Sequence, residues 1–469
     1  MSGLSVVDAA RDAPDAPAII DGDRALTFAA LRDLCLARVA ALAASGVSPG
    51  DRVAVQASNR VEALVTLLAV MERGAVMVPI HPRLSRAERD VIVADASPAL
   101  VLDDDALATF GEGASPMAPT PADDGALLAV VYTSGTTGRP KGATLTRRAF
   151  VESARASAAN LGWRDDDRWL LCLPVCHVGG LSVVTRCLVA RKPLVLLRGF
   201  DVDAVDDAVA RHRCTLVSLV PTMLARVLDA GARAMRLPRA VLLGGAAATP
   251  SLLARAASEG VRVLVTYGLT EACSQVTTWS LDDPSGRRGV GRPLPGVGLR
   301  VVSDGDDPVG RVEVRGPTVS GGYWGHPPRE GEWFDTGDLG WIDDGGALHV
   351  AARRTDLIVT GGENVYPAEV EAALTAHPEV AAAMVFGAPD DVWGQSVQAA
   401  VVAREGAVTD DAWREGLYAF VSEGLAGFKR PKGLAVVEAL PTLSNGKPDR
   451  KAALGVLGPL TRPWGRSRG

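Results

Sequence analysis

A transition from an apolar strand to a loop of small residues organises this chain, and its sequence is Val131-Tyr132-Thr133-Ser134-Gly135-Thr136-Thr137-Gly138-Arg139-Pro140-Lys141-Gly142. The apolar run 127–131 leads into the loop as a buried strand would, and a helix-compatible stretch from Thr146 to about Asn160 follows it. Four hydroxyl side chains, three glycines and one lysine fall within its last ten residues. Because glycine has no Cβ, backbone N–H groups in such a loop can close around phosphate oxygens. The loop is therefore predicted to bind a polyphosphate.

The spacing within this loop argues against a P-loop NTPase. A Walker loop has the pattern G-x-x-x-x-G-K-[ST], whereas here Arg-Pro separates Gly138 from Lys141, and Gly142 stands in place of the magnesium-binding hydroxyl. A short Gly/Ser/Thr cluster alone is equally compatible with a polar turn. The full run T-S-G-T-T-G-x-P-K-G, however, resembles the phosphate loop of the adenylate-forming superfamily of acyl-CoA synthetases, peptide-synthetase adenylation domains and luciferases. The resemblance implies that the loop holds the β- and γ-phosphates of ATP through Thr133, Ser134, Gly135, Thr136, Thr137, Gly138 and Lys141.

Composition narrows the class of protein. With 469 residues the chain is expected to form two or three domains. Its net charge of −6 argues against a nucleic-acid partner, which needs a basic surface. The N-terminus has no secretory signal pattern and no apolar run is long enough to span a membrane, so we expect a cytoplasmic protein without a membrane span. The sequence leaves the oligomeric state open, with a homodimer among the options.

The cysteines are predicted to be buried free thiols rather than disulfides or metal ligands. None of the six forms a C-x-x-C pair, and most lie among apolar neighbours. They are Cys35, Cys172, Cys176, Cys187, Cys214 and Cys273.

Strand-like and helix-like segments alternate along most of the chain. Apolar runs such as 53–55 and 75–79 alternate with helical stretches such as 62–71 and 85–94, and Thr27 is the predicted N-cap of an earlier helix. This alternation predicts an α/β fold with parallel sheets covered by helices. The stretch 103–125, rich in Asp, Gly, Ala and Pro, is predicted as a loop. The predicted domains are a large N-terminal domain (1–353), a hinge (354–356) and a small, mobile C-terminal α+β domain (357–469).

Further motifs follow in the order found in the superfamily. The glycine-rich end of 240–246 resembles the turn beside adenine and assigns Gly245 to ATP binding. The pattern Y-G-x-T-E at 267–271 implies that Tyr267 and Gly268 bind ATP near the adenine, that Thr270 contacts the α-phosphate and that Glu271 binds Mg²⁺. A carboxylate is the hard oxygen ligand that a phosphate-bound Mg²⁺ requires. The run 333–338 resembles the ribose motif, which implies that Asp338 accepts both ribose hydroxyls, although a solvated turn aspartate is the alternative.

The C-terminal third carries the remaining motifs. The stretch 353–371 resembles the superfamily's hinge region, with Arg353 in place of the usual glycine. The resemblance implies that Arg354 contacts the ribose, that Asp356 is the hinge, and that Gly361 and Gly362 face the CoA tunnel. The motif S-x-G-K near the end implies that Lys447 is a mobile catalytic lysine, which binds the attacking carboxylate and the α-phosphate.

Two residues after the predicted strand 169–174 are candidates for the acyl site. His177 stands where ligands bind in open α/β sheets, beyond the carboxyl end of a strand, and it resembles the superfamily's aromatic-or-His gate. A structural role is the alternative for a single histidine. Arg186 lies in an otherwise largely apolar helical segment, where an arginine usually either snorkels or pairs with a carboxylate. That carboxylate would belong either to the fold or to the substrate, as a second free carboxylate.

The substrate is indicated by a closer resemblance. The segments 173–182, 218–222 and 267–276 together resemble o-succinylbenzoate-CoA ligases of menaquinone biosynthesis. The substrate of these ligases is a dicarboxylic aromatic keto acid, whose second carboxylate needs a cationic or polar partner. The predicted acyl pocket comprises His177, Arg186, Ser218, Gly268, Ser274 and Gln275.

The expected activity is an ATP- and Mg²⁺-dependent carboxylic acid-CoA ligase, with catalytic residues Lys447, His177, Thr270 and Glu271. It would form an acyl-adenylate and then a thioester with CoA. Another aryl or medium-chain acyl-CoA ligase, or a free-standing enzyme that charges a carrier protein, remains open. So does a homologue that binds a nucleotide without catalysis.

Overall fold

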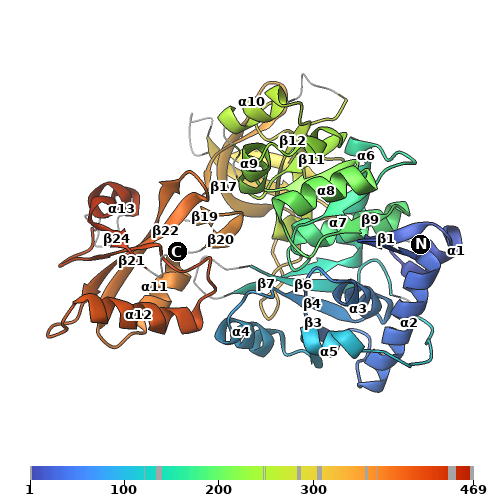
Figure 1. The fold of residues 1–469 in the computed structure, drawn as a ribbon, viewed down its shortest axis with the longest axis horizontal. Coiled ribbons are helices and arrows are strands. Elements are labelled where there is room, and N and C mark those ends of the chain that lie inside the picture. Colours follow the sequence, from blue (N-terminus) through green and yellow to red (C-terminus); the bar gives the residue numbers. More distant parts are fainter. Residues whose placement is uncertain are drawn as a thin grey trace. The chain divides into compact units, whose positions relative to one another are not determined.

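The computed structural model describes residues 3–120, 122–133, 140–246, 248, 250–282, 287–303, 309–353, 358–365, 367–441 and 450–464 (Figure 1). The chain divides into two compact units. The large unit comprises Met1–Pro82, Asp95–Tyr132 and Gly142–Ala352, and the small unit comprises Arg83–Ala94, Thr133–Lys141 and Arg353–Gly469. The hinge predicted at 354–356 lies outside the described residues, so the predicted domain boundary stays a prediction.

A nine-stranded sheet in the order β14-β13-β12-β11-β10-β8-β9-β1-β2 is the largest sheet of the large unit. All neighbouring pairs from β1 to β12 in this order are parallel, whereas β2, β13 and β14 join antiparallel at the ends. The apolar runs predicted as strands form its buried centre, as expected for a parallel sheet covered on both faces. Its strands are β1 (Pro17–Asp21), β2 (Arg24–Thr27), β8 (Trp169–Leu171), β9 (Leu194–Leu196), β10 (Leu216–Leu219), β11 (Ala240–Leu243), β12 (Val263–Leu269), β13 (Ser274–Thr278) and β14 (Arg292–Pro293).

The remaining strands of the large unit form two smaller sheets. A five-stranded sheet has the order β5-β3-β4-β6-β7, with parallel pairing of β3 with β4 and β5, and of β4 with β6. A four-stranded sheet has the order β15-β16-β17-β18 and pairs β16 antiparallel to β15 and β17. These strands are β3 (Arg52–Gln56), β4 (Val76–Ile80), β5 (Leu100–Leu102), β6 (Leu127–Thr133), β7 (Lys141–Thr146), β15 (Gly298–Val302), β16 (Gly310–Arg315), β17 (Phe334–Ile342) and β18 (Leu348–Arg353).

The helices of the large unit follow the predicted pattern with one exception. Thr27 is confirmed as an N-cap, because its hydroxyl accepts a hydrogen bond from the Ala30 N–H at 3.2 Å. The prediction of a loop over 103–125 is wrong in part, because α5 forms there. Asp103 caps this helix, and the buried Leu107 anchors it. The helices are α1 (Val6–Asp12), α2 (Phe28–Ala44), α3 (Val61–Glu72), α5 (Asp104–Thr109), α6 (Arg147–Leu161), α7 (Val178–Ala190), α8 (Val202–His212), α9 (Pro221–Asp229), α10 (Pro250–Ser258), η1 (Arg233–Arg236) and η2 (Thr270–Ala272).

The small unit is an α+β arrangement with its own core. A six-stranded sheet contains β20-β19-β22-β23-β24, and β21 pairs antiparallel with β22. Buried apolar residues of α11, α12 and this sheet form one cluster, which includes Val370, Leu417 and Val397. The strands are β19 (Ile358–Thr360), β20 (Glu363–Val365), β21 (Val380–Asp390), β22 (Gly394–Ala403), β23 (Gly433–Val436) and β24 (Arg462–Pro463). The helices are α11 (Pro367–Thr375), α12 (Asp411–Gly424), α13 (Arg450–Leu457), η4 (Gly458–Leu460) and α4 (Arg86–Ala96), most of which belongs to this unit.

These sheets bear out the predicted α/β class with a large and a small part. None of the helices within the described residues has both the length and the apolar character needed to cross a membrane.

Candidate active site

The predicted phosphate loop joins β6 to β7. Thr133 is the last residue of β6 and Lys141 the first residue of β7, so these two predicted ATP contacts flank the loop. At the end of β6 the Tyr132 hydroxyl donates to Oδ2 of Asp95 at 2.5 Å. Burial and this hydrogen bond raise the pKa of Tyr132, so the phenol remains a donor and anchors the strand where the loop begins. The predicted contacts Ser134, Gly135, Thr136, Thr137 and Gly138 lie outside the described residues.

Glu271, the predicted magnesium ligand, is oriented by a tyrosine that the sequence did not single out. The Tyr323 hydroxyl donates to Oε1 of Glu271 at 2.8 Å. The segment that carries Tyr323 lies beside β7, because the Trp324 N–H donates to the carbonyl of Gly142 at 2.7 Å. The strand that follows the phosphate loop is thereby connected to the carboxylate. An oriented carboxylate of this kind suits a hard cation such as Mg²⁺.

The two residues predicted for the nucleoside meet directly. The Tyr267 hydroxyl donates to Oδ2 of Asp338 at 2.6 Å, and both side chains are buried. Tyr267 lies near the end of β12 and Asp338 within β17, so two different sheets supply them. Gly245, the third predicted contact of this group, follows β11, the neighbour of β12, and has a φ of 79°. Gly245 and Tyr267 thus lie at or near the carboxyl ends of the adjacent parallel strands β11 and β12, where open α/β sheets bind ligands, and Asp338 reaches Tyr267 from the other sheet.

The turn from β12 to β13 depends on a close backbone approach. A Cβ at Gly268 would lie 1.7 Å from the carbonyl oxygen of Ser274, so no larger residue fits. Thr270 lies in η2 within this turn, and Cys273 and Ser274 follow with positive φ values of 53° and 97°. Backbone in this region is strained for residues with a side chain and is found at functional sites. The turn therefore fixes the direction of the Ser274 side chain.

Arg186 is a buried cation that contacts two of the predicted pocket elements. It lies in α7 with 3% of its surface exposed, and its Nη2 donates to Oγ of Ser274 at 3.3 Å. Its guanidinium carbon is 5.4 Å from the centre of the Trp169 ring, and Nε1 of Trp169 donates to Oγ of Ser218 at 3.0 Å. The structure therefore joins Arg186 to Ser274 directly and to Ser218 through Trp169, a residue that sequence reasoning missed.

The charge on Arg186 has only neutral neighbours in the part of the chain that the structure describes. No carboxylate there pairs with it, and its Nε has no hydrogen-bond partner. Burial lowers the pKa of Arg186 to about 10. The group is still protonated at neutral pH, because this value stays well above 7. A second carboxylate on a substrate would complete the pair.

The Gln275 side chain forms its hydrogen bonds with two threonines. Its Nε2 donates to the hydroxyls of Thr278 at 2.8 Å and Thr266 at 3.4 Å, within β12 and β13. Successive side chains of a strand face opposite sides of the sheet, so Gln275 does not share the direction of its neighbour Ser274. The structure brings Arg186 and Ser274 together but places the Gln275 amide on these two threonines.

The segment just before His177 is held in place by a side chain that follows a strand of another sheet. It directly precedes α7. Asn59, which follows β3, donates from Nδ2 to the carbonyl of Leu173 at 3.0 Å and accepts from the N–H of Val175 at 3.1 Å. Sequence reasoning missed Asn59, although a polar residue beyond the carboxyl end of a buried parallel strand was an available signal. The connection that presents His177 is thus tied to a second sheet.

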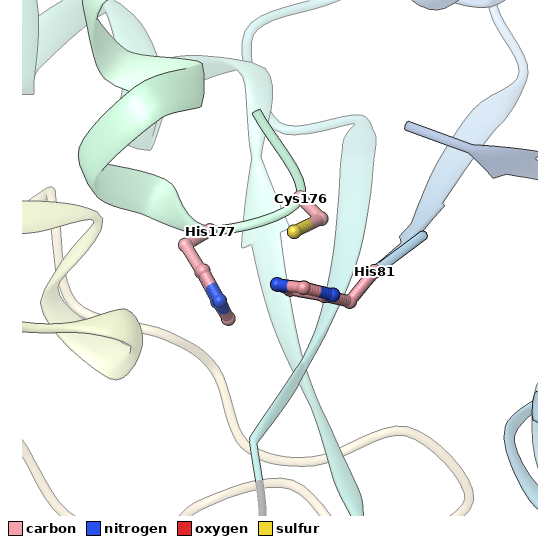
Figure 2. Close-up of side chains that lie close together, drawn as sticks. All are labelled: His81, Cys176 and His177. Carbon is pink, nitrogen blue, oxygen red and sulfur yellow. The ribbon is translucent and has the colours of Figure 1, made fainter. Parts of the chain in front are cut away.

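Two further residues lie beside His177. The centroid of the His81 ring is 5.4 Å from that of His177, and Cys176 directly precedes His177 (Figure 2). His81 follows β4 and is buried, as is Cys176. No sequence motif links His81 to His177, so no role was predicted for His81.

The predicted CoA-tunnel residues form a tight hairpin turn in the small unit. Gly361 and Gly362 connect β19 to β20 with φ values of 59° and 81°, as the favoured two-residue hairpin turn requires. A Cβ at Gly361 would lie 2.6 Å from the ring of Trp393, and the Gly361 N–H donates to the carbonyl of Trp393 at 2.9 Å. The indole of Trp393 therefore packs against the turn. Arg354, Asp356 and Lys447 lie outside the described residues, so their roles stay predictions.

The six cysteines are free and buried, as predicted. Burial raises the pKa of Cys172 and of Cys214 to about 12. Burial likewise raises the pKa of Cys187 and of Cys273 well above the usual value. These four thiols stay protonated near neutral pH and are poor nucleophiles.

Two family models match the chain and account for most of its length. Residues 6–324 match the AMP-binding enzyme family. Residues 369–447 match the AMP-binding enzyme C-terminal domain.

Individual relatives resemble the chain over nearly its whole length. The 2-succinylbenzoate--CoA ligase of Bacillus cereus is 37% identical over 452 residues, which are 91% of this chain and 93% of the relative. Among solved structures, a double mutant of o-succinylbenzoate CoA synthetase from Bacillus subtilis bound with its product analogue OSB-NCoA has a TM-score of 0.89 and 34% identity, covering 95% of this chain and 97% of that one. The enzyme from Bacillus subtilis in complex with ATP and magnesium ion has a TM-score of 0.71 and 33% identity, covering 95% of this chain and 98% of that one.

Proposed function

Because this chain belongs to the AMP-binding enzyme family, we propose that it is an AMP-forming acid-CoA ligase whose acid is 2-succinylbenzoate. The reaction has two steps. The succinyl carboxylate first attacks the α-phosphate of ATP and releases pyrophosphate, and CoA then displaces AMP from the acyl-adenylate. The product is a thioester that would serve menaquinone biosynthesis.

The observation that carries the choice of acid is the buried charge on Arg186. A monocarboxylic acid is consumed as the nucleophile and leaves nothing to pair with this guanidinium. The acid proposed here has a second carboxylate on its ring. This carboxylate would pair with Arg186 and accept a hydrogen bond from Ser274, whose Oγ lies 3.3 Å from Nη2 of Arg186. A charge-assisted pair of this kind in a buried site is strong and directional.

The adenylation step joins two anions, so its main requirement is neutralisation of charge. Lys141, the N–H groups of the phosphate loop and Lys447 would supply positive charge and hydrogen-bond donors. The Glu271 carboxylate, oriented by Tyr323, fits the oxygen ligand that Mg²⁺ prefers. Bound there, Mg²⁺ would stabilise negative charge on the phosphates. No general base is needed, because the attacking carboxylate is itself the nucleophile.

The nucleoside and the thiol would bind to different residues. Tyr267 and Asp338 would bind the adenosine, with Asp338 accepting from the ribose hydroxyls. The turn Gly361–Gly362 in the small unit would line the path of the pantetheine arm. A rotation at the hinge Asp356 would move Lys447 away after adenylation and bring this turn into its place for thioester formation. His177 would border the acyl group. Because ATP and CoA are supplied in the cytoplasm, we place the reaction there.

The test is the acid dependence of both half-reactions. Purified protein is assayed for pyrophosphate release and CoA-thioester formation with ATP, Mg²⁺, CoA and either 2-succinylbenzoate, benzoate, a cinnamate-type acid or a medium-chain acid. Turnover confined to 2-succinylbenzoate supports the proposal. Preferred turnover of a monocarboxylic acid would contradict the choice of acid, and pyrophosphate release without thioester would contradict CoA as acceptor.

A further inference from the structure

Two imidazoles and one thiol converge in the large unit at the ends of two strands. His81 follows β4, and Cys176 and His177 end the connection from β8 to α7. One nitrogen of each imidazole and the Sγ of Cys176 all lie within 4.8 Å of one another. Figure 2 shows the sulfur of Cys176 facing the space between the two rings. Among the residues that the structure describes, no other group of three such side chains was found.

The surroundings hold these donors in place. His81 and Cys176 are 8% and 3% exposed. Asn59 bonds the backbone on both sides of Pro174, through Leu173 and Val175, and so fixes the segment that presents Cys176 and His177. His81 and Cys176 are therefore held in the packed core, whereas His177 is the more exposed of the three donors.

We propose that His81, Cys176 and His177 form a binding site for a borderline-soft divalent cation of the Zn²⁺ class. Imidazole nitrogen and thiolate sulfur are the preferred ligands of such cations, whereas Mg²⁺ requires oxygen. Tetrahedral coordination places N and S donors roughly 3.3 to 3.7 Å apart, so side-chain shifts of about 1 Å would complete the site. On binding, the S–H bond of Cys176 breaks, its proton passes to solvent, and a sulfur lone pair forms the bond to the cation. The fourth position is left to water.

This site is distinct from the Mg²⁺ site proposed at Glu271, although it shares His177 with the acyl pocket. A cation bound there would hold the His177 ring and withdraw it from the acyl group. The site thus gives the enzyme sensitivity to Zn²⁺-class cations. Binding itself is measurable without substrates, so its failure and a failure of the ligase assignment are distinguishable.

The experiment titrates tag-free, metal-free full-length protein with Co²⁺, whose thiolate complexes show a charge-transfer absorption band. We expect one equivalent to bind with that band, to be displaced by Zn²⁺ and to be unaffected by excess Mg²⁺. Cys176→Ser should remove the band, and His81→Asn should weaken binding by at least the roughly 10- to 100-fold that disturbing a metal site costs. Cys214→Ser, which alters another buried free thiol, is the matched control and should keep the band.

Each outcome of the Co²⁺ titration either supports or overturns the proposed cation site. Absence of stoichiometric binding of Co²⁺ and Zn²⁺ would overturn the proposal. So would a band that survives Cys176→Ser, or one that Cys214→Ser removes equally. If Cys176→Ser does not fold, as thermal melting would reveal, His81→Asn decides alone, and unchanged affinity in that variant refutes the site.

Discussion

Replacing Arg186 by methionine isolates the role of its charge. Methionine keeps most of the length of the side chain and its apolar contact with Trp169 but removes the guanidinium. If Arg186 binds the ring carboxylate of 2-succinylbenzoate, the variant loses transition-state stabilisation for that acid. It should lose none for 3-benzoylpropionate, which carries the same keto acid without the ring carboxylate.

The magnitude follows from burial. Arg186 is 3% exposed, so a carboxylate paired with it is largely removed from water. Removing one partner of a buried, hydrogen-bonded charge pair costs about 2 to 5 kcal/mol. At about 1.36 kcal/mol per tenfold change, kcat/KM for 2-succinylbenzoate should fall by about 30- to 5,000-fold. The assay measures CoA-thioester formation with each acid at saturating ATP and CoA.

Thermal stability distinguishes this role from a structural one. No carboxylate in the described part of the chain pairs with Arg186, so Arg186→Met breaks no ion pair and should leave the melting temperature unchanged or higher. Arg239→Met is the matched control, because Arg239 forms a buried ion pair with Asp167 at 2.6 Å and its loss should lower the melting temperature. An equal loss of activity for both acids, or a fall in stability like that of Arg239→Met, would refute the assignment.

Three further predictions concern the turn, the core and the small unit. Gly268→Ala places a Cβ 1.7 Å from the Ser274 carbonyl and should cost about 1 to 3 kcal/mol or more of stability, together with ligase activity, as measured by melting and by thioester assay. Asp167→Asn leaves Arg239 without its charge partner and should cost about 3 to 5 kcal/mol at pH 7 in urea unfolding. Burial raises the pKa of Asp167, but hydrogen bonds from Arg239 and other donors outweigh it and lower the pKa overall; the stabilisation is therefore present above the usual carboxyl pKa of about 4 and is lost as the pH falls through the lower folded value. Lys447→Ala should slow pyrophosphate release by about 10²- to 10³-fold while sparing thioester formation from supplied acyl-adenylate.

Each of these variants has a control elsewhere in the chain. Gly199→Ala adds a Cβ with nothing within 4 Å and should change little. Asp229→Asn breaks an exposed pair with Arg255 and should cost at most about 1 kcal/mol. Lys432→Ala removes an exposed lysine and should leave pyrophosphate release intact. Equal effects of a variant and its control would contradict the mechanism assigned to that variant.

The fold was predictable where apolar runs and helix caps recur along the sequence. The strands of the parallel sheets are continuous apolar runs, and α2 and α6 have threonine caps at their starts, so local sequence suffices to place them. Helix α5 was missed because it is short, acidic and anchored by one apolar side chain, Leu107. Its formation depends on a tertiary contact, which overrides the loop-like composition of the segment.

For the candidate site, the sequence motifs predicted which residues share a role, and the structure shows which of them lie in contact. Tyr267 and Asp338 stand in separate motifs, and their contact agrees with the shared nucleoside role that the motifs predicted. The residues that position the motifs were not predictable in the same way. Tyr323 and Asn59 reach Glu271 and the His177 segment from 52 and 114 residues away, through contacts that only the folded topology creates.

The charge on Arg186 connects the stability of the free protein to the choice of substrate. Its lowered pKa, about 10, reflects a cation held among neutral groups, which is unfavourable for the empty pocket. An acid with a second carboxylate relieves this penalty on binding, whereas an acid without one leaves it in place. Discrimination between the two acids therefore comes partly from a cost already present in the fold, in addition to any attraction formed on binding. It follows that removing the charge should relax the choice of acid without destabilising the free chain, and both results should appear together in Arg186→Met.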